Sequence, residues 1–287
     1  MGTIAVAAAL VVAVGLFVVN ARLEKAVVGS IDQAILSVGP NELFAYDSVD
    51  VQSARGTVRM NGIVYRRPDM AAVFEAASFA ISAKPWELVM LAQSGGASAL
   101  SEISGALEDF RIRFQVDGGA VQLQHGRARV SGNFTESAVS QGVEALVATI
   151  EAIDVSFREI SVTPGDRMLQ RIQTGMQHTP WLADEANWSA ASVELQARRD
   201  GSVVVVDRFA VDAALAQVHA QGRGTLNTLG EPVPEEGRIV VERMHPELRR
   251  QVRETGSFYF GIQIPEEGTF TVNYARDEQG VPGFNVE

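Results

Sequence analysis

Apolar side chains recur at every second position through most of the chain after residue 49, and this period of two restricts the fold more than any other feature. The stretch FRIRFQVDGGAVQLQ, residues 110–124, is the clearest example, because apolar Phe110, Ile112 and Phe114 alternate with charged or polar residues. The DGG sequence within it is typical of a tight turn, after which the alternation resumes. This pattern predicts an antiparallel hairpin with one apolar face and one solvated face.

The same alternation returns in several other stretches, with glycine or proline where the chain would turn or bulge. The longest of them, residues 192–227, contains Asp200-Gly201 as the predicted turn of a second hairpin. Helical patterns are shorter and include residues 85–88, which begin with proline, 135–150 and 245–256. We therefore predict a mainly-β (α+β) domain of antiparallel hairpins that form a curved, twisted sheet with a few short helices.

A short internal echo marks the C-terminal part. The sequence PEEGRIVVERM begins at Pro234, and PEEGTFTVNYA begins at Pro265. Each copy predicts a turn built from proline and glycine that leads into an alternating strand. Two copies of so short a phrase do not indicate a solenoid, but they suggest that a strand–helix–strand unit is reused.

The N-terminal segment has a different character. Residues 3–19 carry no charge, and Thr3 is their single polar side chain. As a helix they would span roughly 26 Å, which is close to the thickness of the hydrocarbon core of a bilayer. We predict a single transmembrane helix over residues 1–21 that contacts the lipid bilayer through residues 3–19. A cleaved signal peptide is the alternative, since Val19-Asn20-Ala21 resembles a weak cleavage site.

Two further segments follow the predicted anchor. Residues 22–40 have an apolar stripe with helical spacing, which predicts a juxtamembrane amphipathic helix that stops at Pro40. Residues 41–287 contain no Ser/Gly-rich linker and no charge block, so we expect one β-rich extracytoplasmic domain there. The stripe in the juxtamembrane segment consists of Leu23, Val27, Ile31 and Ile35.

The basic residues near the anchor bear on its orientation. Arg22 and Lys25 follow the apolar segment, and no basic side chain precedes it. Taken literally, the positive-inside rule would keep the C-terminal bulk in the cytoplasm. Against this stand the lack of cysteine and the β-rich character of the remainder, and the extracytoplasmic placement of residues 41–287 rests partly on the family resemblance described below.

The chain is acidic, with a formal net charge of −11 over 287 residues. Binding to nucleic acid requires a basic surface that contacts phosphates, so the composition argues against a nucleic-acid partner. The same charge disfavours broad electrostatic docking on anionic lipid. With 46% hydrophobic residues, the chain can build a substantial core.

Motifs for catalysis and for cofactor or metal binding do not occur in the sequence. There is no cysteine, no G-x-S-x-G elbow, no P-loop and no dinucleotide fingerprint. The adjacent acids Asp184-Glu185 have the character of solvated loop residues. We predict neither an enzyme nor a bound cofactor or metal ion. The histidines are scattered without a metal-ligand spacing, at His125, His178, His219 and His245.

Two sets of residues are candidate binding surfaces. The segment HTPWLADEANW, residues 178–188, concentrates aromatic rings without clear periodicity. Its His178, Trp181 and Trp188 either pack into the protein's own core or form a docking loop for a partner or a bilayer surface. The other set is the apolar face of the predicted strands, an expected groove for a lipid or acyl chain, formed by Val58, Met60, Phe79, Ile81, Phe110, Ile112 and Phe114.

The layout as a whole resembles AsmA-like and related single-anchor bacterial envelope proteins. The apolar N-terminal segment and VQSARGTVRMNGIVYRRPDMAAVFEAASFAISAKPWELVML carry the resemblance, which covers residues 3–130; in the second stretch, a glycine-containing strand leads to another strand and a short helix. The resemblance implies a single-pass protein of the bacterial inner membrane with a periplasmic C-terminal domain and a role in envelope or lipid homeostasis. The chain is far shorter than the larger members, so a conduit across the periplasm is not implied.

Two functions remain open at this point. In the first, the protein binds lipid or acyl chains in an apolar groove. In the second, it is a non-catalytic structural or assembly subunit of a membrane protein complex, with a membrane protein as its partner. The helix predicted near residues 139–150 would cover the apolar face in the second case, whereas that face would stay open in the first.

Overall fold

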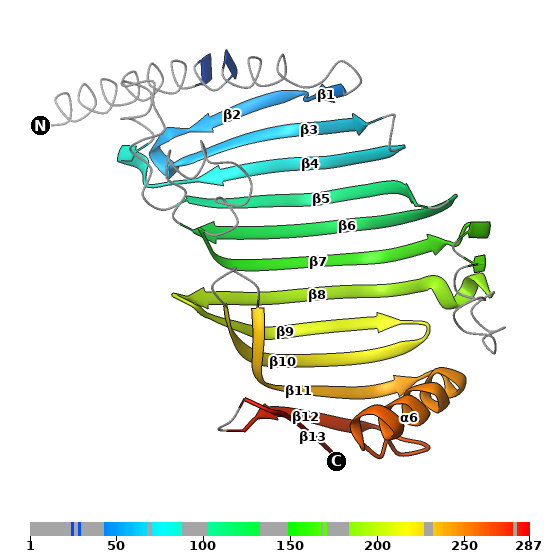
Figure 1. Ribbon diagram of the computed structural model, residues 1–287. Helices are drawn as coiled ribbons and strands as arrows, with labels where there is room; N and C mark the ends of the chain where they lie inside the picture. The colour runs from blue at the N-terminus through cyan, green and yellow to red at the C-terminus, as the bar shows by residue number, and fades with distance from the viewer. Residues whose placement is uncertain are drawn as a thin grey trace, which may run out of the picture. The chain divides into compact units, whose positions relative to one another are not determined.

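The computed structural model is mainly β and describes most of the chain after residue 43 (Figure 1). In the described residues the strands pair antiparallel and the helices are few, which confirms the predicted mainly-β fold class. Within the described residues, no helix is both long and apolar enough to cross a membrane. The predicted anchor over residues 3–19 lies outside them. The described residues are 24–25, 28–29, 43–67, 71–87, 103–116, 118–132, 149–167, 169–170, 184–226, 232–277 and 280–287.

The chain divides into two compact units. In the predicted juxtamembrane helix over residues 22–40, residues 24–25 and 28–29 are helical, and the others lie outside the described part of the chain. Unit 1 comprises Met1–Asp69, Val73–Phe110 and Arg129–Ile150, and unit 2 comprises Met70–Ala72, Arg111–Ala128 and Glu151–Glu287.

Unit 1 is built around a central long strand. Strands β1 and β2 pair antiparallel with successive parts of β3, and β4 follows β3 in the strand order. Gly62 of β3 has a φ of 63°, and a Cβ added there would overlap the carboxylate of Asp47. The elements described in unit 1 are β1 (Leu43–Ala45), β2 (Ser48–Gln52), η1 (Ser53–Arg55), β3 (Thr57–Arg67), β4 (Ala72–Ser82) and part of β5 (Ile103–Val116).

The described part of unit 2 is a series of antiparallel strands together with the long helix α6. From β7 to β13 each strand pairs with the next one in sequence. The predicted turn at Asp200-Gly201 is confirmed, and Gly201 has a φ of 60°. Its elements are parts of β5 and β6 (Gly119–Gly132), β7 (Ile150–Thr163), η5 (Glu185–Trp188), β8 (Ser189–Asp200), β9 (Val203–Ala213), β10 (Ala216–Leu226), β11 (Pro232–Met244), α6 (Pro246–Phe260), β12 (Phe270–Arg276) and β13 (Pro282–Val286).

The strand registers of unit 2 align apolar side chains into rows on one face, called here the dry face. Row 1 consists of Phe157, Val193, Val211, Val218, Val241 and Phe270. Row 2 consists of Val155, Leu195, Phe209, Ala220, Ile239, Val272 and Val286. Row 3 consists of Ile153, Ala197, Val206, Gly222, Gly237, Tyr274 and Phe284.

The opposite face of unit 2, the wet face, carries ion pairs. Arg208 lies 3.0 Å from Glu194, and Arg198 lies 3.1 Å from Asp207. These side chains are largely exposed, so each pair adds little to stability. The prediction of one apolar and one solvated face therefore holds for unit 2. Burial of the apolar rows contributes more to its stability than these ion pairs do.

Register shifts interrupt the period of two along the strands of unit 2. Asp207 is an extra residue of β9 relative to β8, and it allows Val206 and Phe209 to share the dry face although they are three positions apart. Glu235 and Glu242 are the extra residues of β11 relative to β10. Such bulges increase the twist of a strand and bend it. At each of these shifts the extra residue is acidic and has no register partner on the neighbouring strand. The apolar residues on either side of it therefore stay aligned in their rows.

Three helix predictions have different outcomes. The helix at residues 245–256 is confirmed, because α6 follows His245 with Pro246 at its first position and ends at Gly261 in the left-handed conformation. For the helix predicted at 135–150, the assignment of Ile150 is wrong, because it begins strand β7; residues 133–148 lie outside the described part. In the turn predicted at residues 85–88, residues 85–87 are helical and residue 88 is not described.

Candidate functional site

An open apolar groove of about 610 Å³ lies on the dry face of unit 2. Row 2 forms one wall through Leu195, Phe209 and Ile239, and the two glycines of row 3 form the floor. The residues that line it belong to strands β8 to β13, so the groove crosses the strands rather than following one of them. Because Gly222 and Gly237 lie at its centre, we call it the glycine groove.

The floor of the glycine groove is backbone. Gly222 and Gly237 are directly opposite each other in the β10–β11 pairing. A Cβ added to Gly222 would lie 2.8 Å from the carbonyl oxygen of Glu236, and one added to Gly237 would lie 3.2 Å from that of Gln221. The close approach of the two strands therefore requires glycine at 222. The depression forms because the two glycines have no side chains, whereas most of the row 2 residues that line the groove have large ones.

An aromatic pair closes the groove at the β12–β13 end. The rings of Tyr274 and Phe284 lie 5.3 Å apart at an angle of 53°. The Tyr274 hydroxyl donates a hydrogen bond to the carbonyl of Pro234 at 3.0 Å, which fixes the ring across to β11. Ile239 and Phe284 are each 40% exposed, a large fraction for apolar side chains on one face. Exposed apolar residues grouped in a hollow are typical of a binding surface.

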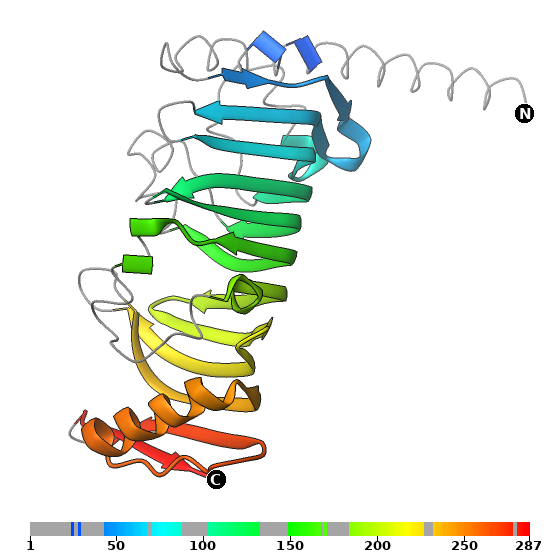
Figure 2. The same cartoon turned by 90° about the vertical axis from the view of Figure 1, so that its right-hand side faces the viewer.

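Helix α6 covers the neighbouring part of the dry face (Figure 2). The buried core there consists of Val241 and Phe270 from row 1 and Ile264 from the segment after the helix, with Val252 of α6 packed against them. Arg249 of α6 is only 7% exposed and donates hydrogen bonds to the carbonyls of Pro265, at 3.2 Å, and Gly268, at 2.6 Å. Its guanidinium also lies 5.2 Å from the centre of the Phe270 ring.

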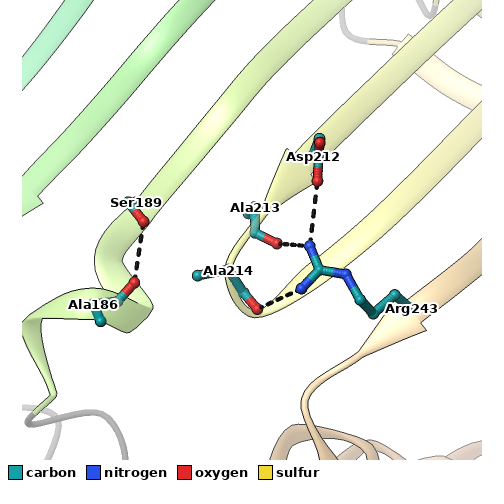
Figure 3. Close-up of polar contacts among 6 residues, drawn as sticks. All are labelled: Ala186, Ser189, Asp212, Ala213, Ala214 and Arg243. Carbon is teal, nitrogen blue, oxygen red and sulfur yellow. Dashed lines mark hydrogen bonds and ion pairs between the residues drawn. The ribbon is translucent and has the colours of Figure 1, made fainter.

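A second arginine fastens the turn between β9 and β10 to the end of β11. Arg243 donates to the carbonyl of Ala213 at 2.9 Å, to that of Ala214 at 3.3 Å and to the carboxylate of Asp212 at 3.3 Å (Figure 3). The same figure shows the hydroxyl of Ser189 bonded to the carbonyl of Ala186 at 3.0 Å. These contacts close chain turns and serve the architecture rather than a reaction.

A larger hollow of about 1080 Å³ lies between α6 and the end of β13. Its lining mixes the charged residues Arg253, Glu254, Glu266 and Glu287 with polar and apolar ones. Arg253 and Glu266 pair with each other across it. This hollow has a mixed lining, whereas the surface of the glycine groove is almost wholly apolar, so the groove is the better fit for a hydrophobic ligand.

The apolar residues selected from the sequence lie elsewhere. Val58, Met60, Phe79 and Ile81 are half-buried on β3 and β4, and Phe110 is buried on β5 with its ring 5.8 Å from that of Phe74. These five belong to unit 1, whereas Ile112 and Phe114 are half-buried in unit 2. None of the seven lines the glycine groove. The signal that was missed is the cluster of glycines at 222, 224 and 237 within alternating strands.

The tryptophan segment is only partly described. His178 and Trp181 lie outside the described residues, and Trp188 is half-buried in η5. The Asp184 carboxylate accepts a hydrogen bond from the backbone N–H of Ala186 at 3.0 Å and thereby caps η5. Asp184, the first of the two adjacent acids, thus has a structural role in the local turn.

Polar clusters elsewhere in the described chain are pairs on exposed surfaces. His219 lies 3.5 Å from Glu242, and His125 lies 3.8 Å from Glu159. In the part of the chain that the structure describes, no three histidine or acidic side chains gather as metal ligands would. Among the described residues, the glycine groove is therefore the best candidate for a binding site, because its apolar surface would suit a hydrophobic ligand.

Comparison with models of protein families gave no match, and comparison with curated proteins gave none either. The functional argument accordingly rests on the geometry of the glycine groove.

Proposed function

We propose that unit 2 binds the hydrocarbon chain of a lipid or acyl compound in the glycine groove. The observation that carries this proposal is an open depression of about 610 Å³ whose walls are Leu195, Phe209, Ile239 and the Tyr274–Phe284 pair. Small-molecule sites are mostly apolar and typically have volumes of about 300–1,000 Å³. The strand carbonyls and N–H groups of the floor are engaged in the sheet, so the surface offered to a ligand is mainly hydrophobic.

The energetics of such binding depend on chain length. Each methylene group removed from water contributes about 0.8 kcal/mol, which corresponds to an affinity gain of about fourfold. The proposal therefore requires affinity to rise with each carbon until the chain fills the groove. A ligand recognised by polar groups alone would show no such dependence.

We further propose that residues 3–19 anchor the protein in the bacterial inner membrane and that the groove serves envelope lipid homeostasis from the periplasm. The uncharged N-terminal sequence and the AsmA-like layout support this placement. A reporter that is active only outside the cytoplasm, fused after Glu287, tests it. An active fusion is expected, and a stable but silent fusion would contradict the placement.

An uncharged fluorescent probe tests the groove itself. N-phenyl-1-naphthylamine becomes bright in apolar surroundings, and we expect it to bind the full-length protein. The variant Ile239→Asp places a carboxylate in the wall and should weaken binding at least tenfold, because burying that charge against the probe is costly. Val281→Asp is the matched control, since Val281 is exposed outside the groove lining. Equal binding by both variants would contradict the proposal, and circular dichroism would verify that each is folded.

A further inference from the structure

A cationic side chain is fixed at one end of the glycine groove. The Arg276 Nε donates to the carbonyl of Pro234 at 2.8 Å and to the hydroxyl of Tyr274 at 3.0 Å. Its Nη1 donates to the carbonyl of Gly280 at 3.1 Å. Pro234 and Tyr274 both line the groove, so these bonds hold the guanidinium against its rim. A guanidinium has five N–H donors, and the bonds to neutral oxygens engage only part of this capacity.

Arg276 differs from most neighbouring arginines in its electrostatic partners. Arg198 and Arg208 each pair with an acidic side chain on the wet face, and Arg223, which is also part of the groove lining, lies 3.5 Å from Glu235. Among the described residues, no carboxylate lies within ion-pairing distance of Arg276, which is exposed. The described acids nearest to it in sequence and across the strands have other contacts. Asp277 accepts the N–H of Val281, while Glu235 and Glu236 lie beside Arg223.

We infer that the groove selects a single-chain anionic amphiphile, a long-chain fatty acid whose carboxylate is bound by Arg276 and whose chain lies on the glycine floor. This inference rests on the binding function proposed above and adds the chemical class of the ligand. Charge complementarity supports it, because a guanidinium that has no acidic partner among the described residues borders an apolar depression. A fork of N–H donors also matches the two oxygens of a carboxylate. The volume of about 610 Å³ suits one hydrocarbon chain with a small head group.

The test compares two amphiphiles that differ only in the head group. Palmitate and hexadecanol compete with N-phenyl-1-naphthylamine for the full-length protein at pH 8, where the fatty acid is ionised. We expect palmitate to compete about three- to tenfold more strongly than hexadecanol. In the variant Arg276→Gln this advantage should disappear while competition by hexadecanol stays within about twofold. Arg238→Gln is the control. Arg238 is also exposed, but it lies on the wet face of β11, at the register position opposite Asn273 of β12.

The outcomes separate this inference from the function on which it rests. If the probe does not bind the unmodified protein, the binding function itself fails. If the probe binds but palmitate and hexadecanol compete equally, the head-group assignment is wrong. If Arg276→Gln weakens both compounds to the same degree, Arg276 only supports the groove wall, and the inference is again overturned. Acetate should not displace the probe, and displacement by acetate would show a simple anion site instead of an amphiphile site.

Discussion

The covered and open parts of the dry face of unit 2 are built from the same strands but have opposite characters. In row 1, Val241 and Phe270 are buried beneath α6 and the segment that follows it, and Phe270 is only 2% exposed. In rows 2 and 3, Ile239 and Phe284 are each 40% exposed beside the glycine groove. Two residues along β11 separate a core position, Val241, from a groove position, Ile239.

This difference indicates how stability and binding are divided within one sheet. Burying an apolar side chain stabilises the fold, and an exposed apolar hollow forgoes part of that gain. Helix α6 concentrates the stabilising contacts on one side, together with the hydrogen bonds of Arg249 to the carbonyls of Pro265 and Gly268, which we call the arginine clamp. On the other side, the paired Gly222 and Gly237 have no side chains, and the depression above them stays open. Substitutions on the two sides should therefore separate loss of stability from loss of binding.

The largest effect is expected in the covered part. Phe270→Ala should lower the free energy of unfolding by about 3–5 kcal/mol, because it leaves a cavity in the core beneath α6. Denaturant unfolding followed by circular dichroism measures the change. A loss below about 1 kcal/mol would show that α6 does not form a tight core on row 1.

The arginine clamp should give the next effect. Arg249→Met removes the hydrogen bonds to the carbonyls of Pro265 and Gly268 and should cost about 2 kcal/mol, because bonds from charged donors are the stronger ones and both carbonyls lose their partner. Arg250→Met is the matched control one residue along the helix, where an exposed pair with Glu247 should contribute less than about 0.5 kcal/mol. Similar losses in both variants would refute the clamp.

The smallest effect on stability is expected in the open part. Phe284→Ala should change the free energy of unfolding by less than about 1 kcal/mol, since the ring is partly exposed. The same variant should weaken binding of N-phenyl-1-naphthylamine about fivefold, because the aromatic end of the groove is lost. Urea titration and probe titration on one preparation give both numbers. A large loss of stability with unchanged binding would reverse the assignment of the two parts.

Local pattern predicted a good share of the fold. Alternation identified the hairpins, and Asp200-Gly201 and the helix after His245 lie where turn and helix signals placed them. The PEEG echo shows the limit of such reasoning. Residues 265–268 end in a turn with Gly268 at a φ of 80°, as expected, but residues 234–237 lie inside β11, where Gly237 is opposite Tyr274. The same four residues adopt two conformations because residues 234–237 pair with neighbouring strands, whereas residues 265–268 precede β12 and join no strand.

The glycine groove could not be predicted because it depends on pairing over long distances in sequence. Gly222 and Gly237 become neighbours only through the register of β10 and β11, and that register contains bulges at Glu235 and Glu242. Assigning every second residue to the same face of the sheet fails at each bulge, because the extra residue moves the following side chains to the opposite face. Which part of the face stays open depends further on where α6 lies, and that position is set by tertiary packing.

The most direct test of a ligand groove is the identity and amount of what the protein retains. Full-length protein, Ile239→Asp and Val281→Asp would be purified in parallel, and the bound organic compounds extracted and quantified by mass spectrometry. We predict close to one acyl-chain compound per chain in the unmodified protein and in Val281→Asp, and a strong depletion in Ile239→Asp. Equal amounts in all three proteins, or no such compound in the unmodified protein, would contradict the assignment of the glycine groove as a binding site.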